Sequence, residues 1–395
     1  MAIISIAKFL LLLCGLAILL FNSQASSTRK SLLNAHTPVA IVVVLLSFAA
    51  SLLWTLAPQA DALGSMAKYG KLLVMVLILY LIRDRREASY ALGAFVGAQI
   101  FLLLSSWLLF FQIPVPWATS NMASTHYAVF SSYLDQGIIS AVLAAICWHL
   151  RSLVPGRLGK FAAVFIALMA MSNVLFVLSG RTGHVVAIAL LSLAIMWELP
   201  KKYRAAVVAL PFLLALLLFA SSSKVRDRLT LVKTEVQAYS TQTISITSSG
   251  IRLGLWRSAV NIIALHPVAG AGVGSWSTEH NRVQRAQNPA HLDIQGNGNP
   301  HQEYLLWGVQ LGIPGLLLFL GLMVSVWRDA LQMGEPCARA TQSVLAALAV
   351  ACLFNSSIYD ALIGDFFCVA IGLLLALGLR QPKSADELPN SRFAT

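Results

Sequence analysis

Three side chains with chemistry to offer stand beside apolar stretches of this sequence. Arg181 follows an uncharged run in LSGRTGH, Arg252 opens IRLGLWRSAV, and His301 precedes another apolar run in NPHQEY. A guanidinium at the end of a membrane span is costly unless it reaches water or an anion. Planar guanidinium groups bind phosphate oxygens in pairs. Two arginines and a histidine on one membrane face therefore suggest a site for a phosphate-bearing lipid, with ordinary head-group contacts as the alternative.

His301 is the candidate general base, because an imidazole with an ordinary pKa near about 6.5 can accept a proton at neutral pH. Gly308, Gly312 and Gly315 follow it by 7, 11 and 14 residues. On a continuous helix these spacings lie within roughly 40° of one face. We therefore predict that His301 shares a packed glycine face and that the helix kinks at GIPG. The alternative is a histidine that only caps the start of a span.

Neither a metal nor a cofactor is expected. The segment GAGVGS, residues 270–275, resembles a nucleotide loop, but no strand precedes it, so a tight turn after Pro267 is the better interpretation. The histidines and carboxylates of the polar insert lack a metal-binding spacing such as HExxH. These residues are His280, His291, His301, Glu279 and Asp293.

The composition indicates which elements must position these side chains. Of 395 residues, 58% are hydrophobic and only 11% are charged, a balance that a water-soluble fold does not sustain. The sequence predicts an all-α polytopic membrane protein with eleven spans, or twelve if the N-terminal residues are read differently. The predicted spans are 2–22, 38–57, 67–82, 89–111, 137–154, 160–179, 184–199, 205–222, 303–327, 340–357 and 362–379.

Basic clusters predict the topology. The net charge of +12 is spread in short groups between apolar runs, which indicates cytoplasmic loops and argues against nucleic acid as a partner. The polar insert is then periplasmic, and none of the five cysteines lies in it. The predicted domains are an N-terminal transmembrane bundle (1–222), a periplasmic loop domain (223–302), C-terminal transmembrane helices (303–380) and a cytoplasmic tail (381–395).

The insert is predicted to hold two helices. Residues 224–240 form a basic amphipathic pattern, and residues 251–267 form a second helical pattern that ends at Pro267. From 270 to 300 the chain is rich in Gly, Asn, Gln and Pro, which predicts an irregular loop.

One motif is specific. His301 and Gln302, followed by Gly312 and Gly315, fit the pattern His-(Asn/Ser/Gln)-x9-Gly-x-x-Gly at the end of the long predicted periplasmic loop. The sequence thereby resembles the O-antigen ligase family, within a wider group that includes O-antigen polymerases and bacterial O-oligosaccharyltransferases. The resemblance extends over most of the chain, although such ligases are expected to have twelve spans. Its other motif residues are Arg181 at the outer end of a mid-chain span, Arg252 and Trp256 in an Arg-x3-Trp helix, and Pro267, Gly270 and Gly272 in a Pro-x-x-Gly-x-Gly turn.

The resemblance implies a GT-C-like enzyme of the bacterial inner membrane with a periplasmic active site. The implied reaction is inverting, metal-independent transfer of a glycan from undecaprenyl pyrophosphate to a sugar hydroxyl of lipid A core. His301 would be the base, while Arg181 and Arg252 would bind the pyrophosphate. Because pyrophosphate leaves as a stable anion, arginines can replace the acid that a glycosidase needs. Trp256, Arg257 and Gln302 are further candidates for substrate binding, and Gly308 belongs with the structural glycines.

Three other functions stay open. An O-antigen polymerase uses the same type of donor but extends a lipid-linked chain. A protein O-oligosaccharyltransferase transfers the glycan to Ser or Thr, but such enzymes often carry a larger C-terminal extension. A transporter of lipid or anions is less favoured, because the sequence has no detectable inverted halves and its ionisable candidates cluster at the outer rim of the spans.

Overall fold

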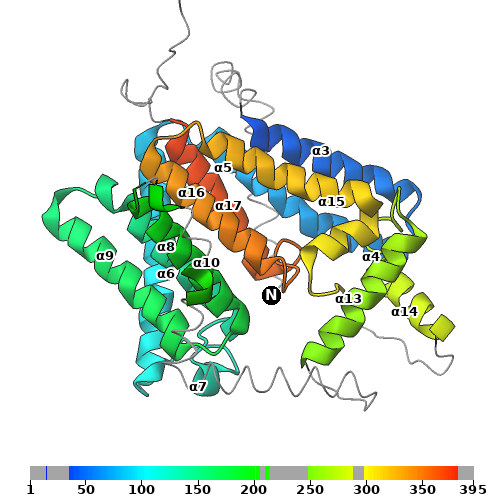
Figure 1. Cartoon of the computed structure of the whole chain (residues 1–395), viewed down its shortest axis with the longest axis horizontal. Helices are drawn as coiled ribbons and strands as arrows, with labels where there is room; N and C mark the ends of the chain where they lie inside the picture. Colours follow the sequence, from blue (N-terminus) through cyan, green and yellow to red (C-terminus); the bar gives the residue numbers. More distant parts are fainter. Residues whose placement is uncertain are drawn as a thin grey trace, which may run out of the picture.

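The computed structural model describes residues 15, 35–200, 202–204, 210–213, 248–287 and 298–380. These residues form helices and connecting turns without strands (Figure 1). Eight helical segments are long and apolar enough to cross a membrane, so the predicted all-α polytopic fold is confirmed. They are built from α3 (His36–Ala50), α4 (Gln59–Tyr69) continuing into α5 (Leu73–Leu81), α6 (Arg85–Phe110), α8 (Tyr133–Leu150), α9 (Gly156–Ser172), α10 (Arg181–Glu198), α15 (Glu303–Ala330) and α17 (Ala361–Gly378).

These eight segments correspond to eight of the predicted spans. The predicted spans 2–22 and 205–222 lie almost wholly outside the described residues. The predicted span 340–357 differs: helix α16 (Glu335–Ala351) begins earlier, carries Glu335 and Arg339 in its first turns, and stops at Ala351. At 17 residues it is not among the eight. The total of eleven spans stays a prediction.

The helices form two groups joined by a central pair (Figure 1). In one group, α8 packs against α9 and α10, and in the other, α15 packs along α3. Between them, α17 contacts α5 and α6, and α16 contacts α8, α10 and α15. A four-residue helix α7 (Ala123–His126) lies in the connection between α6 and α8.

Glycines allow α8 and α10 to approach closely. A Cβ atom placed at Gly183 would lie 3.1 Å from the Cα atom of Gly137, and one at Gly180 would lie 3.2 Å from the carbonyl oxygen of Tyr133. Side chains larger than hydrogen would therefore push the two helices apart. The contact places Arg181, the first residue of α10, beside the first turn of α8.

Two helices of the polar insert are described. Helix α13 (Ser248–Leu265) agrees with the predicted helix 251–267 and packs against α15. Helix α14 (Trp276–Gln287) corrects the prediction of an irregular loop at 270–300. Its buried residues Trp276, Glu279, His280 and Val283 recur at helical spacing on one face, a signal that the surrounding Gly and Asn residues obscured.

The other predictions for this part of the chain are not tested. The predicted helix 224–240 and the tail 381–395 lie outside the described residues, and the domain boundaries stay predictions.

An aromatic cluster joins α3, α4 and α15. Phe48 stacks on Tyr69 with ring centroids 4.0 Å apart, and Trp307 meets both rings edge-on. Phe319 and Tyr359 extend the cluster. These five rings, all at most 5% exposed, form a rigid base beneath the site described next.

Candidate active site

Helix α15 is broken at Gly312, as the sequence predicted. Gly312 has φ 70° and ψ −158°, and Pro314 follows within the same helix. Because Pro314 has no N–H, the carbonyl of Gln310 loses the helical donor four residues ahead. The break also turns the N–H of Ile313 away from Val309. Two carbonyls and one N–H therefore need other partners.

The turn after Pro267 supplies those partners. The N–H of Ala271 donates to the carbonyl of Val309 at 2.8 Å, and the N–H of Gly272 donates to that of Gln310 at 2.9 Å. The N–H of Ile313 donates to the carbonyl of Pro267 at 2.8 Å. We call this set of contacts between residues 267–274 and 309–313 the turn–helix junction. It joins the two glycine motifs of the sequence, one on each side of the His301 segment.

Glycine is required at this junction by both space and conformation. Gly270 and Gly272 have positive φ values. A Cβ atom at Gly270 would lie 2.4 Å from the backbone carbon of Gln310, and one at Gly312 would lie 2.5 Å from the carbonyl oxygen of Pro267. These approaches are backbone to backbone, so no side chain can move to relieve them. Gly308 and Gly315 are close-contact positions too, against Ile263 and Trp307.

His301 lies outside α15, which corrects the expectation that it shares a helical face with the glycines. The helix begins at Glu303, and His301 has φ 52°, in the left-handed region. An Asn299 side-chain oxygen accepts a hydrogen bond from the His301 N–H at 2.8 Å. This local bond stabilises a backbone conformation that a residue with a side chain rarely adopts.

The two residues after His301 anchor the helix start. The Oε1 atom of Gln302 accepts a hydrogen bond from the N–H of Leu305 at 2.5 Å, so Gln302 is the N-cap. Asn, Ser and Gln at this motif position share such an acceptor. Glu303 is fully buried, and its carboxylate accepts hydrogen bonds from the Ile358 N–H and from the Trp307 indole. The segment bearing His301 is thus fixed to both α15 and the turn before α17.

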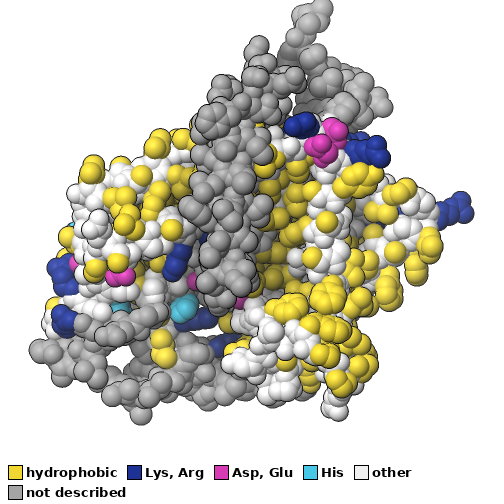
Figure 2. Space-filling view, turned by 180° about the vertical axis from the view of Figure 1, so that it is seen from behind, with side chains coloured by type: hydrophobic (Ala, Val, Ile, Leu, Met, Phe, Trp, Pro, Cys, Tyr) yellow, Lys and Arg dark blue, Asp and Glu magenta, His cyan; other side chains and the backbone are white. Residues whose placement is uncertain are grey.

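The charge of Arg252 acts on His301, and the charge of Arg181 acts on Arg252, although the three residues are far apart in the sequence. Burial and the charge of Arg252 lower the pKa of His301. Burial and the charge of Arg181 lower the pKa of Arg252, an effect partly opposed by Tyr133. Gathered, half-buried guanidinium groups repel each other, and an anion bound between them would relieve that repulsion. Figure 2 shows that charged and His side chains on this face lie mainly from the left edge to the lower centre, with a second charged group at the upper right.

Sequence reasoning missed a second set of residues at this site. Asn299, which holds the His301 backbone, donates from Nδ2 to the Asp360 carboxylate at 3.2 Å. Burial, and then the charge of Asp135, raise the pKa of Asp360 to about 6. Asp360 directly precedes α17. A charged residue at the end of an apolar span was the signal that marked Arg181, and the same signal was available at Asp360.

Among the other predicted residues, Trp256 and Arg257 lie on α13. The Trp256 indole N–H is buried and donates to no group in the described part of the chain. Arg257 is exposed. Among the described residues, none of the histidines forms a metal-type cluster with carboxylates or cysteines, and His291 and Asp293 lie outside these residues.

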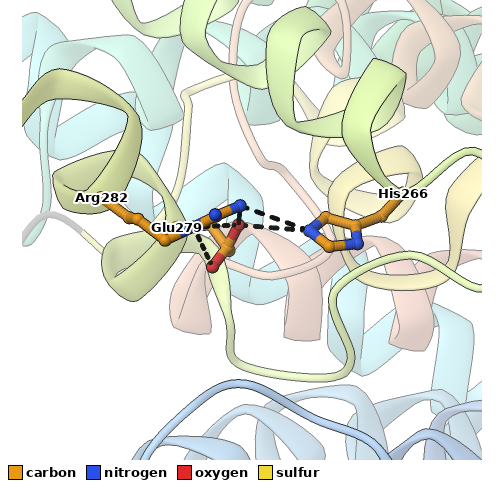
Figure 3. Close-up of polar contacts among 3 residues, drawn as sticks. All are labelled: His266, Glu279 and Arg282. Atoms are coloured by element: carbon orange, nitrogen blue, oxygen red, sulfur yellow. Dashed lines mark hydrogen bonds and ion pairs between the residues drawn. The ribbon is translucent and has the colours of Figure 1, made fainter. Parts of the chain in front are cut away.

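A buried carboxylate of the insert, that of Glu279, stabilises α14. Glu279 is 1% exposed, and Arg282 and His266 contact its carboxylate (Figure 3). The Arg282 Nη2 to Glu279 Oε2 distance is 2.6 Å, and the His266 Nε2 to Glu279 Oε2 distance is 3.4 Å. His280, another metal candidate, pairs its Nδ1 with the Ser258 hydroxyl at 2.9 Å. These contacts join α14 to α13 and to the turn that follows it.

Comparison with known families gives one match. Residues 166–320 match the family described as O-antigen ligase. The match confirms the resemblance to the O-antigen ligase family. It includes the two arginines, the turn–helix junction and His301, and it excludes Asp360. Comparison with curated proteins found no match.

The O-antigen ligase family match supports a general activity. Together with the eight membrane-length helices, it supports a multi-pass membrane protein of the ligase and polymerase type and implies lipid-linked polysaccharides as substrates. The gathered arginines suit such substrates, since lipid-linked glycans carry phosphate at the join between lipid and sugar.

Proposed function

We propose that the protein is an O-antigen ligase of the bacterial inner membrane. It transfers a glycan from undecaprenyl pyrophosphate to a sugar hydroxyl of lipid A core, at a site open to the periplasm. The observation that supports this proposal is the pair of charge effects that link Arg181 to Arg252 and Arg252 to His301. The prenyl tail stays in lipid while the pyrophosphate reaches the arginines.

In the proposed reaction, an acceptor hydroxyl oxygen attacks the anomeric carbon of the donor. The carbon–oxygen bond to the pyrophosphate breaks, the electron pair leaves with the phosphate oxygen, and the configuration inverts. His301 takes the hydroxyl proton and later releases it to water. Because burial and Arg252 lower its pKa, His301 is neutral at neutral pH and can act as a base.

Arg181 and Arg252 stabilise the leaving pyrophosphate. Charge accumulates on the phosphate oxygens as the bond breaks, and preorganised donors in a partly buried site stabilise such charge strongly. The reaction therefore needs no metal ion to neutralise the leaving group. The Trp256 N–H is buried and reaches a substrate oxygen only if the surrounding side chains move. The exposed Arg257 can meet a more distal part of the substrate.

The test begins with a strain deleted for the gene. A ligase predicts lipopolysaccharide without O-antigen on a gel, together with accumulated, fully polymerised lipid-linked glycan. Wild-type protein should restore the profile and His301→Ala should not, at equal protein abundance. Core capped with a single repeat would instead indicate a polymerase. An unchanged profile would redirect the search to protein glycosylation or transport.

A further inference from the structure

A further cation, Lys68 on α4, lies beside the segment that carries His301. Its Nζ atom lies 4.0 Å from the centroid of the Tyr359 ring and 3.9 Å from the position a Cβ atom would take at Gly298. Gly298 precedes Asn299 and His301 in the segment leading into α15. Lys68 therefore lies near the residues that precede α15 and α17, although it comes from a helix distant in sequence.

The aromatic cluster beneath Lys68 is held rigidly. The Tyr359 hydroxyl shares a hydrogen bond with Ser65 at 2.9 Å, and Tyr359 and Tyr69 are both buried. Tyr69 is held in turn by Gln310, whose Nε2 donates to its hydroxyl at 2.8 Å. Gln310 also accepts a hydrogen bond from the Gly274 N–H, so the aromatic cluster is bonded to the turn–helix junction. An ammonium group held over this rigid aromatic cluster is preorganised.

Lys68 connects to His301 through a short chain of polar contacts. The charge of Lys68 lowers the pKa of Asp360, which accepts from Asn299, which accepts from the His301 N–H. The two arginines reach His301 by a different route, through α10 and α13. His301 is therefore linked to cations carried by three different helices, α4, α10 and α13.

Lys68 differs from its neighbour Lys71 in a way that indicates a binding role. Lys71 is buried and donates to the carbonyl of Asp360 at 2.7 Å, so it holds the turn before α17. Lys68 is exposed, and among the described residues its ammonium makes the cation–π contact without an ion pair. A held and exposed cation near the proposed base, with no ion pair among the described residues, is suited to an anion on a substrate.

We propose that Lys68 binds an anionic substituent, phosphate or carboxylate, on the acceptor, and so marks the acceptor side of the site. This inference rests on the proposed function, in which the arginines already hold the donor pyrophosphate. The acceptor must approach His301 from a side those arginines leave open, and the wall formed by Lys68, Tyr359 and Asp360 offers one. Binding the anion there brings a nearby hydroxyl toward the imidazole.

The experiment uses purified full-length protein, lipid-linked glycan donor and lipid A core acceptor in three preparations: intact, dephosphorylated, and with its carboxylates methyl-esterified. KM for acceptor and for donor are measured for wild type, Lys68→Gln and Lys68→Arg. With intact acceptor, Lys68→Gln should raise the acceptor KM about tenfold, as expected for one charge-assisted contact, and leave the donor KM unchanged. Lys68→Arg should stay close to wild type.

The modified acceptors identify the anion. On the preparation that lacks the bound group, wild type and Lys68→Gln should have the same acceptor KM, so loss of the difference after dephosphorylation assigns a phosphate and after esterification a carboxylate. An unchanged ratio on all three acceptors, or a raised donor KM, would overturn the proposal for Lys68 alone. If wild type formed no product on any lipid A core, the ligase function itself would fall, and this inference with it.

Discussion

The turn–helix junction and the charged site occupy neighbouring parts of the same chain but are held in different ways. At the junction, Gly270 and Gly312 meet backbone atoms, and main-chain hydrogen bonds join the two segments. At the site, Arg181, Arg252 and His301 are linked by the effects of charge and burial on pKa. Substitutions at the junction should therefore lower the stability of the fold, whereas substitutions at the site should lower activity and leave stability unchanged.

The largest effect is expected at His301. Asn tolerates the left-handed backbone that this position adopts, so His301→Asn removes the base with little change in strain. Transfer by purified protein should fall about 10²- to 10⁴-fold, while the unfolding temperature in detergent stays close to wild type. Activity near that of wild type would show that another group takes the proton.

Arg252 gives the next largest effect. Arg252→Ala should lower the rate of transfer about 10²- to 10³-fold, as for loss of a preorganised donor to developing charge. Arg252→Lys should recover only part of it, because an ammonium cannot bind two oxygens in the guanidinium geometry. Arg285→Ala, an exposed change on α14, is the matched control and should be active. Equal rates for Arg252→Ala and Arg285→Ala would remove Arg252 from the mechanism.

The junction should respond in stability. Gly312→Ala introduces a Cβ atom 2.5 Å from the Pro267 carbonyl oxygen at a positive φ, which should cost roughly 2 to 4 kcal/mol of folding free energy. Thermal unfolding and protein abundance in membranes measure this. Gly321→Ala, in the same helix with nothing within 4 Å of the added atom, should be neutral. Equal stability of the two variants would show that the junction adds nothing to the fold.

Gln302 tests the helix start. Gln302→Ala removes the acceptor for the Leu305 N–H and should destabilise the protein by about 1 kcal/mol. Gln302→Asn and Gln302→Ser keep an acceptor and should lose less. If Gln302 mainly binds substrate instead, the alanine variant will unfold at the wild-type temperature and show a raised KM.

The smallest effect is a displacement of the pH profile. His301 must be neutral to take a proton, so the rate should fall as the pH drops through its pKa, which burial and Arg252 lower. Arg252→Gln removes one of these causes, so the acid limb should move to higher pH. Arg252→Lys keeps the charge and should leave the limb in place. If the acid limb does not move when the charge at residue 252 is removed, a group other than His301 gives rise to that limb.

Much of this arrangement could be predicted from the sequence. The membrane helices follow from long apolar runs, and the kink follows from Gly312 and Pro314, because both signals are local. The position of His301 could not be predicted, since a helical wheel assumes that the helix includes the residue. In the structure the helix begins at Glu303, with Gln302 as its N-cap, and so leaves His301 outside.

The missed residues have a different cause. Asp360 reaches the His301 segment only through a tertiary contact, the hydrogen bond from Asn299, a residue 61 positions away in the sequence. Lys68 joins them from α4 by the same kind of contact. Residue spacing carries no information about such pairs. Helix α14 was missed because its polar residues hide a short buried face.

The junction has a consequence for which parts of the chain can vary. Main-chain hydrogen bonds tie residues 267–274 to residues 309–313, so the chain between them leaves and returns to one fixed point. Those bonds depend on glycine and backbone geometry, not on the side chains of the enclosed segment. The exposed side chains of α14, which lie in that segment, can therefore change while the main-chain bonds that hold its two ends stay the same.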